Sequence, residues 1–302
     1  MTSHLRLPVA VFVVLWSVTV AQAPDLRAGA AAPPPVYGED GIQESAHHPD
    51  PRLRAMANSV AALVPQRDVR IRGNEIALGG ETLADYVMER CGGPLCDGGR
   101  FRNQPTPAFC SGFLIESDLL VTAGHCIRNE RVCQRTRFVF DFKMDDRGSV
   151  APLERYDVFE CQALVRRVNR RGVDFAVVRL DRDTGRPGLE MEADDVIGIG
   201  TPLALIGHPF GLPMKIAAGG TVVRPRSGDS VFETTLDALD SNSGSPVIST
   251  ITYRVEGVLA RGEEDFVETA DGCFMLKQCP DDGSTCRLED VVRMGVVMQR
   301  LP

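Results

Sequence analysis

Residues 122–126 read Thr-Ala-Gly-His-Cys and follow an apolar stretch of the chain. Further along, residues 174–180 read Asp-Phe-Ala-Val-Val-Arg-Leu, and residues 240–246 read Asp-Ser-Asn-Ser-Gly-Ser-Pro. Each segment has an ordinary explanation by itself: a packed histidine, an aspartate at a turn, and a loop of small residues. Taken together, in the order His, Asp, Ser, they supply a base, a group that orients it, and a nucleophile.

The chemistry explains why these three residue types are needed together. A serine hydroxyl is a weak nucleophile, so His125 must take the proton of Ser243 during attack and return it to the leaving amine. A buried carboxylate at Asp174 would hold the imidazole in one tautomer and stabilise the imidazolium. Small residues around Ser243 let the backbone turn sharply and direct N–H groups at a developing oxyanion.

Short strands surround these segments. After residue 100, apolar runs alternate with Gly, Pro and Asp turns, which predicts an all-β sandwich or a pair of barrels. Before residue 100, Asp50-Pro51 offers a helix start, and apolar residues at helical spacing continue until Pro65, which predicts a helix there. The predicted strands are Ser111–Ile115, Phe138–Phe142, Phe159–Val165, Phe175–Leu180, Leu203–Ile206, Thr221–Val223, Val231–Thr235, Pro246–Ile248, Val255–Ala260 and Val292–Gln299.

With the three motifs in this order, the sequence resembles the trypsin/chymotrypsin-like serine peptidases over roughly residues 100–300. It is most similar to the bacterial branch that includes the glutamyl endopeptidases, which carry Asn-Ser-Gly-Ser-Pro, as residues 242–246 do here. The resemblance implies an all-β fold of two six-stranded antiparallel barrels, with the site in the cleft between them. It implies a peptidase domain over 100–302, with one barrel at about 100–185 and the other at about 195–300.

The resemblance also assigns roles to residues. Ser243 would be the nucleophile, His125 the general acid and base, and Asp174 the orienting carboxylate, with the oxyanion hole formed by the backbone N–H groups of Ser241 and Ser243. Ser241 stands where the family usually has Gly, at a position that often needs a φ that Ser tolerates poorly. Asn242 replaces the Asp that pairs with a new N-terminus in trypsin-like members, so we expect activation without that ion pair.

Substrate preference is less determined. Asp237 matches the position that gives trypsin-like enzymes their preference for Lys or Arg, and Gly262 would leave room in that pocket. Arg261 sits nearby and would neutralise Asp237. The equally weighted alternative is that Asp237 is a hydrogen-bonded structural residue. Leu259 falls where glutamyl endopeptidases carry a pocket histidine, which argues against glutamate specificity.

Nine cysteines suit a core supplemented by disulfides. The resemblance pairs Cys110 with Cys126 beside the catalytic histidine. We expect Cys133–Cys161 to join strands of the first barrel, two of the last three cysteines to pair, and Cys91–Cys96 to close a short local loop. A zinc site fits poorly because there is no Cys-x-x-Cys and the five histidines are scattered, so we expect neither metal nor cofactor.

Residues 1–23 have the features of a cleavable secretory signal: Arg6, a short apolar run, and Ala-Gln-Ala at the end. A membrane anchor is the alternative, but the run is shorter than the roughly 20 residues a spanning helix needs. Residues 24–99 would then be a Pro- and Ala-rich linker or propeptide and an N-terminal extension, with Val36 resembling a mature start. The alternative is that the whole of 24–100 is retained.

Two functions from different classes fit the sequence. The first is a secreted serine endopeptidase, extracellular or periplasmic, that acts on protein or peptide substrates through an acyl-enzyme. The second is a catalytically silent binding or adhesion module on the same barrels. The formal net charge of −8 argues against a nucleic-acid or anionic-membrane partner. We expect a monomer.

Overall fold

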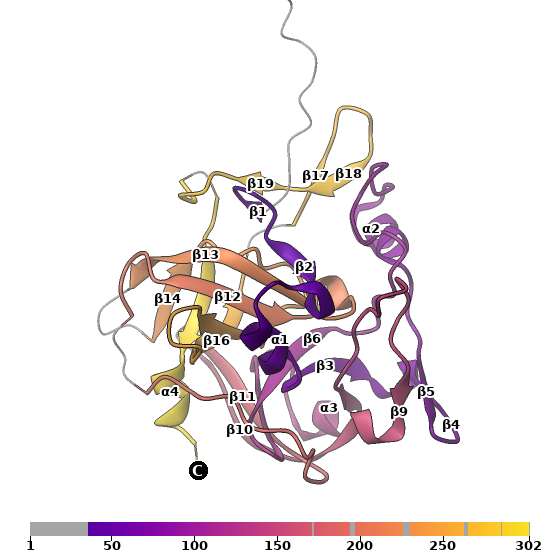
Figure 1. Ribbon diagram of the computed structural model, residues 1–302, viewed down its shortest axis with the longest axis vertical. Helices are drawn as coiled ribbons and strands as arrows, with labels where there is room; N and C mark the ends of the chain where they lie inside the picture. The colour runs from indigo at the N-terminus through magenta and orange to yellow at the C-terminus, as the bar shows by residue number, and fades with distance from the viewer. Residues whose placement is uncertain are drawn as a thin grey trace, which may run out of the picture. The chain divides into compact units, whose positions relative to one another are not determined.

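The first barrel is a closed ring of six antiparallel strands, in the order β10-β11-β7-β6-β3-β8. Strands β3, β6, β10 and β11 of this barrel lie in the lower half of Figure 1. The computed structural model describes residues 36–170, 172–193, 197–225, 230–262, 265–284 and 286–301. The strands are β3 (Val60–Pro65), β6 (Cys110–Glu116), β7 (Leu119–Thr122), β8 (Thr136–Val139), β10 (Val158–Arg170) and β11 (Val173–Leu180).

The second barrel is also closed by six antiparallel strands, in the order β12-β15-β16-β20-β14-β13, with β13 pairing back to β12. Its strands are β12 (Pro202–Gly207), β13 (Lys215–Pro225), β14 (Val231–Thr234), β15 (Pro246–Ser249), β16 (Val255–Arg261) and β20 (Glu289–Arg293). The predicted all-β fold of two six-stranded barrels is therefore confirmed, and it is a chymotrypsin-like fold.

One apolar cluster joins the two barrels. Phe113 and Phe175 of the first barrel belong to the same buried cluster as Ile206, Val258 and Val292 of the second. Burying a side chain of this size contributes roughly 1.5–3 kcal/mol, so the packed face between the barrels is a major source of stability. Loops that leave strands at this face are held at fixed positions relative to each other.

Residues 51–65 are a helix only in their first half, so the prediction for this segment was partly wrong. Helix α1 (Pro51–Ala57) begins at Asp50, whose carboxylate accepts the N–H groups of the first turn. Residues 60–64 are fully buried one after another and form strand β3 between β6 and β8. A strand enclosed on both faces has a continuous apolar run, which here coincided with helical spacing.

Strand β3 also corrects the predicted boundary of the first barrel. The barrel takes one of its six strands from residues 60–65, well before the expected start at residue 100. The extension is thus partly an integral piece of the barrel. At the other end, Val292–Gln299 is a strand only to Arg293 and then continues as helix α4 (Met294–Met298), whose apolar side chains pack on the joint core.

Residues before β3 lie along the second barrel. Strand β2 (Ile42–Glu44) pairs with the edge of β13, and β1 (Val36–Tyr37) pairs with β19 (Gln278–Cys279). The ammonium group of Lys215, which is 2% exposed, donates to Glu44 Oε2 at 3.0 Å and to Gln104 Oε1 at 2.8 Å. These contacts fasten the N-terminal extension to the barrel through a fully partnered buried charge.

The remaining elements are short. They are β4 (Val69–Arg72), β5 (Glu75–Leu78), α2 (Leu83–Cys91), α3 (Glu130–Gln134), β9 (Leu153–Glu154), β17 (Phe266–Glu268) and β18 (Phe274–Leu276). No helix in the described part of the chain is both long enough and apolar enough to span a membrane. The expected signal segment, residues 1–23, lies outside the described residues.

Candidate active site

The histidine segment leaves β7 at Thr122 and turns tightly against β11. At Gly124, a Cβ atom would lie 2.5 Å from the carbonyl oxygen of Val168 and 2.8 Å from Asp174 Oδ1, so only glycine fits. Arg167 donates through Nε to the carbonyl oxygen of Gly124 at 2.7 Å. The segment therefore holds His125 at the mouth of the first barrel.

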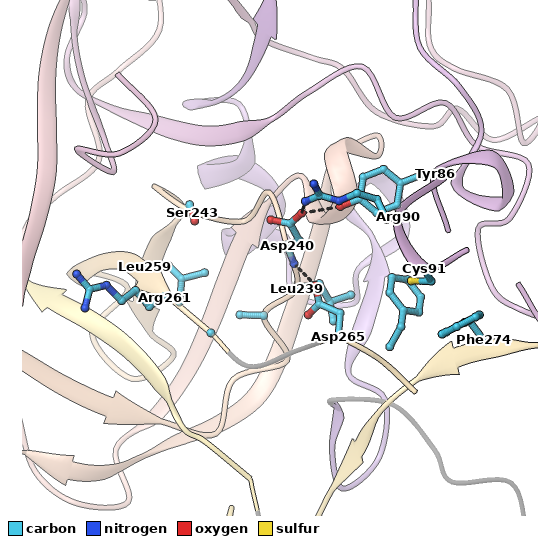
Figure 2. Close-up of a pocket in the computed structure, with 13 residues that line it drawn as sticks. Tyr86, Arg90, Cys91, Leu239, Asp240, Ser243, Leu259, Arg261, Asp265 and Phe274 are labelled. Carbon is cyan, nitrogen blue, oxygen red and sulfur yellow. Dashed lines mark hydrogen bonds and ion pairs between the residues drawn. The ribbon is translucent and has the colours of Figure 1, made fainter. Parts of the chain in front are cut away.

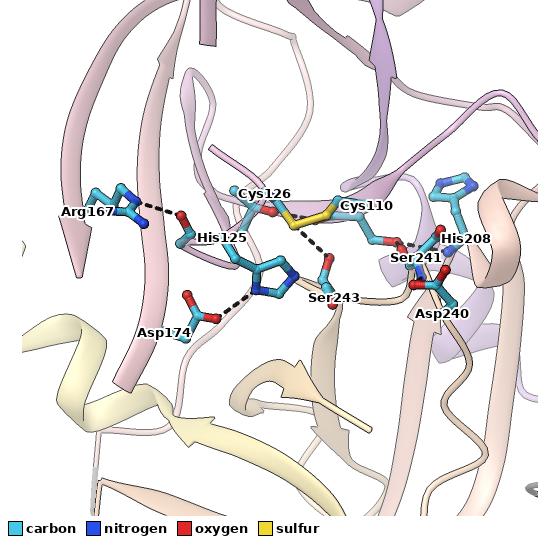
Figure 3. The surroundings of a disulfide bond; sticks show 12 residues. Cys110, His125, Cys126, Arg167, Asp174, His208, Asp240, Ser241 and Ser243 are labelled. Atoms are coloured by element: carbon cyan, nitrogen blue, oxygen red, sulfur yellow. Dashed lines mark hydrogen bonds and ion pairs between the residues drawn. A yellow bond between two sulfur atoms is a disulfide. The ribbon is translucent and has the colours of Figure 1, made fainter. Parts of the chain in front are cut away.

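Strand register brings the carboxylate of Asp174 to this histidine. Ala176 pairs with Thr122, so the start of β11 lies beside the residues that follow β7. Asp174 is 2% exposed, and its Oδ2 lies 2.7 Å from Nδ1 of His125 (Figure 3). With the Nδ1 proton directed at the carboxylate, Nε2 keeps its lone pair and is available as a base.

Ser243 lies in the loop between β14 and β15. Its carbonyl oxygen accepts the N–H of Ser111 at 2.9 Å, which attaches the loop to β6 of the other barrel. Gly244 follows at φ +90°, where a Cβ atom would lie 2.2 Å from the carbonyl oxygen of Ser111. In Figure 3 the imidazole of His125 lies between Asp174 and Ser243. In the described part of the chain no hydrogen bond joins the Ser243 hydroxyl to His125, as is common before substrate binds.

Ser241 has the unusual backbone that the sequence led us to expect. Its φ is +67°, in the left-handed region that favours glycine. Its N–H does not point into free space, because it donates to Oδ1 of Asp240 at 2.8 Å. One of the two expected oxyanion donors is therefore occupied by the side chain of the preceding residue.

A cavity of about 580 Å³ opens beside Ser243 (Figure 2). Two of the three predicted pocket residues, Arg261 and Gly262, line it. Sequence reasoning missed the wall that Tyr86 and Arg90 of α2 contribute. The one local signal for this wall is the Thr82–Asp85 capping pattern that begins the helix, and nothing in it indicates where the helix packs. The other lining residues are Cys91, Ala238, Leu239, Asp240, Leu259, Asp265, Phe266 and Phe274.

Asp237 does not line this cavity. It is 6% exposed, and its two carboxylate oxygens accept the N–H groups of Tyr37 at 2.8 Å and Gly41 at 2.9 Å. Burial raises the pKa of Asp237 to about 7, although both hydrogen bonds favour the ionised form. Of the two alternatives for this residue, the structural one fits, and the carboxylate holds the N-terminal extension against the barrel.

Asn242 is likewise enclosed, at 3% exposure. The N–H of Val36 donates to the carbonyl oxygen of Lys277 at 3.2 Å, within the pairing of β1 and β19.

His208, in the neighbouring loop, is fully buried and its Nδ1 bonds to the carbonyl oxygen of Leu212 at 2.9 Å. Burial lowers the pKa of His208 to about 3, so this histidine belongs to the packing of a turn.

Four disulfides cross-link the chain. The Cys110–Cys126 pair beside His125 and the Cys133–Cys161 pair of the first barrel are confirmed. The pairing of two of the last three cysteines is also confirmed, as Cys279–Cys286. The expected Cys91–Cys96 loop is wrong, because Cys96 bonds to Cys273 and thereby ties the segment after α2 to the hairpin of β17 and β18.

Cys110, His125 and Cys126 place ligand atoms within 4.8 Å of one another. The two sulfur atoms are joined in a disulfide, so they are not thiolates that a metal ion would take.

Comparisons with known proteins match one family model to the part of the chain that contains these residues. Residues 110–258 match the model of the trypsin-like peptidase domain. Among solved structures, a Glu endopeptidase matches at 16% identity, with a TM-score of 0.48, over 87% of this chain and 95% of that one. The VesB protease of Vibrio cholerae matches at 12% identity, with a TM-score of 0.49, over 86% of this chain and 65% of that one. No curated protein sequence matches. With its two barrels and its match over 110–258, the chain carries a trypsin-like peptidase domain on a chymotrypsin-like fold.

Proposed function

We propose that this protein is a secreted serine endopeptidase that cleaves peptide bonds through an acyl-enzyme on Ser243. The observation that carries the proposal is the 2.7 Å contact between His125 Nδ1 and the buried carboxylate of Asp174, beside the Ser243 loop of a trypsin-like peptidase domain. A buried carboxylate paired with a part-exposed imidazole is the arrangement that general-base activation of serine requires.

In the proposed reaction, His125 takes the hydroxyl proton of Ser243 as the oxygen attacks the scissile carbonyl carbon. The same imidazole then protonates the leaving amine, and the acyl group stays on Ser243. Water, deprotonated by His125, attacks the acyl carbon; the bond to Ser243 Oγ then breaks, His125 returns the proton to this oxygen, and the second product leaves as the acid. The N–H groups of Ser241 and Ser243 would stabilise the oxyanion in both steps.

Secretion and activation belong to the same proposal. Residues 1–23 would direct export, and four disulfides are typical of proteins that fold in an oxidising compartment. We propose that maturation removes the residues before Val36 and that activation does not depend on an ion pair at the neutral Asn242. The substrates would be proteins or peptides.

A fluorophosphonate probe tests the enzyme directly, because it reacts covalently only with an activated serine. We expect the wild-type protein to be labelled and the Ser243→Ala variant to remain unlabelled. The occupied N–H of Ser241 favours one competing function, a catalytically silent binding module on the same barrels. If the probe labels neither the wild type nor any variant with an altered Asp240, the result would support that second function.

A further inference from the structure

The carboxylate of Asp240 joins two parts of the chain that lie about 150 residues apart. Its Oδ1 accepts the N–H of Ser241 at 2.8 Å. Its Oδ2 accepts the hydroxyl of Tyr86 at 2.5 Å and the guanidinium of Arg90 at 3.0 Å (Figure 2). Three donors from two segments therefore converge on one side chain.

Helix α2 is well placed to hold this carboxylate. Its side chains Leu83 and Val87 are buried, and the chain just after it is fixed by the Cys96–Cys273 disulfide. Tyr86 and Arg90 are one helical turn apart, so both reach the same oxygen from one face of the helix. The ring of Tyr86 also packs on Phe210, with the centroids 5.6 Å apart.

The backbone of Asp240 is fixed as well. Its N–H donates to Oδ2 of Asp265 at 2.8 Å, and its carbonyl oxygen accepts the N–H of Phe210 at 2.5 Å. The backbone of Asp240 therefore stays in place when the side chain changes its rotamer. Because this side chain is 44% exposed, it can rotate into solvent without disturbing the core.

Resting on the proposed function, we propose that Asp240 is an internal inhibitor of the oxyanion hole, held over the Ser241 N–H by Tyr86 and Arg90 of α2. A tetrahedral intermediate needs that N–H as a donor, and a carboxylate at the same place both occupies the donor and repels the developing negative charge. Catalysis then requires the Asp240 side chain to move away, so α2 controls the fraction of molecules that are competent.

The inhibition is reversible and moderate. Arg90 is 63% exposed, and an ion pair in solvent is weak and screened by salt. If the Asp240 side chain has left the Ser241 N–H in roughly one molecule in ten, Ser243 of the wild type reacts about tenfold more slowly than in a protein without this carboxylate.

The test measures the second-order rate constant for labelling of Ser243 by a neutral fluorophosphonate. We expect Asp240→Ala to react about tenfold faster than the wild type. Tyr86→Phe keeps the ring and removes the hydroxyl, and Arg90→Gln removes the charge; each should accelerate labelling about two- to threefold. In the Asp240→Ala background neither should have a further effect, because both act through that carboxylate.

Arg102→Gln is the matched control, since Arg102 does not line this cavity and its guanidinium lies 3.2 Å from a carboxylate oxygen of Asp97 in an ion pair at the surface. It should label at the wild-type rate. Raising the salt concentration should accelerate the wild type but not Arg90→Gln, a response that a purely structural role of Arg90 would not produce. Circular dichroism of each variant verifies the fold.

The outcomes separate this proposal from the proposed function. If the wild type labels and Asp240→Ala labels at an equal or lower rate, the internal inhibitor is rejected and the serine peptidase stands. If Tyr86→Phe and Arg90→Gln still accelerate labelling in the Asp240→Ala background, α2 acts by another route and the proposal is also rejected. If no variant labels, the proposed function itself fails, and the inhibitor with it.

Discussion

His125 and Asp174 lie on the first barrel, whereas Ser241 and Ser243 lie on a loop of the second, and different forces set the geometry of the two halves. In the first half, the pairing of β7 with β11 places a buried carboxylate 2.7 Å from the imidazole. In the second half, a residue at φ +67° donates its N–H to Asp240, which a helix from the N-terminal extension holds in place.

Strand pairing in the first barrel sets the geometry of His125 and Asp174, whereas contacts with the surface helix α2 set the position of the carboxylate beside the Ser241 N–H. Sheet hydrogen bonds and a packed core resist change, so the acid–base pair is built into the fold. Exposed hydrogen bonds break at little cost, so the oxyanion half responds to small changes at α2. The two halves therefore predict variants of very different severity.

The largest effect is expected at Asp174. Asp174→Asn would present an amide N–H to His125 and favour the wrong imidazole tautomer, which lowers kcat/KM by roughly 10⁴-fold. Stability should hold, because Oδ1 of Asp174 has no hydrogen-bond partner among the described residues and the variant buries no charge. Peptide hydrolysis and thermal unfolding measure the two effects. An activity within tenfold of the wild type would refute the orienting role.

Asp237 offers the second test. It is a buried acid next to the second barrel, and its carboxylate accepts the backbone N–H groups of Tyr37 and Gly41. Burial raises its folded pKa to about 7, above the 3.8 of an unperturbed Asp, so the folded protein holds a proton between these pH values that the unfolded chain has lost. The contribution of Asp237 to stability is therefore fully present below about pH 4 and is lost as the pH rises through 7.

Asp237→Asn removes this titration. The free energy of unfolding of the wild type, measured relative to the variant, should fall by about 2 kcal/mol or more between pH 5 and pH 8. His208, whose pKa burial lowers to about 3, is present in both proteins and cancels in the difference. Denaturant unfolding at the two pH values checks the sign. Hydrolysis should change less than threefold, and a lost preference for Lys or Arg would return Asp237 to the substrate pocket.

The smallest effect is expected at Ser241. Ser241→Gly relieves a left-handed backbone that costs a non-glycine residue roughly 1 kcal/mol, while it raises the entropy of the unfolded chain. We expect a gain of about 0.5 kcal/mol in the free energy of unfolding and a labelling rate within threefold of the wild type, since the N–H remains. A loss of more than 1 kcal/mol would show that the serine side chain stabilises the loop.

Local patterns predicted much of the barrels, because turn residues and strand-length apolar runs are decided by neighbours in the chain. The same logic failed where local evidence was ambiguous. The run Val60–Val64 has helical spacing but is enclosed on both faces as a strand, and the apolar residues after Arg293 form helix α4. In both cases the surrounding layers decided the element.

By itself, the sequence determined the chemistry-bearing motifs, the all-β architecture, and two disulfides: Cys110–Cys126, which the family resemblance paired, and Cys133–Cys161, which was expected to join strands of the first barrel. Only the tertiary structure decided that α2 reaches Asp240, that Asp237 holds the extension, and that Cys96 pairs with Cys273. These partners are 154 to 200 residues apart along the chain, so no local pattern encodes them. These three contacts depend on both barrels being closed and packed, because the packed barrels provide the surface that the N-terminal extension and the loops cover.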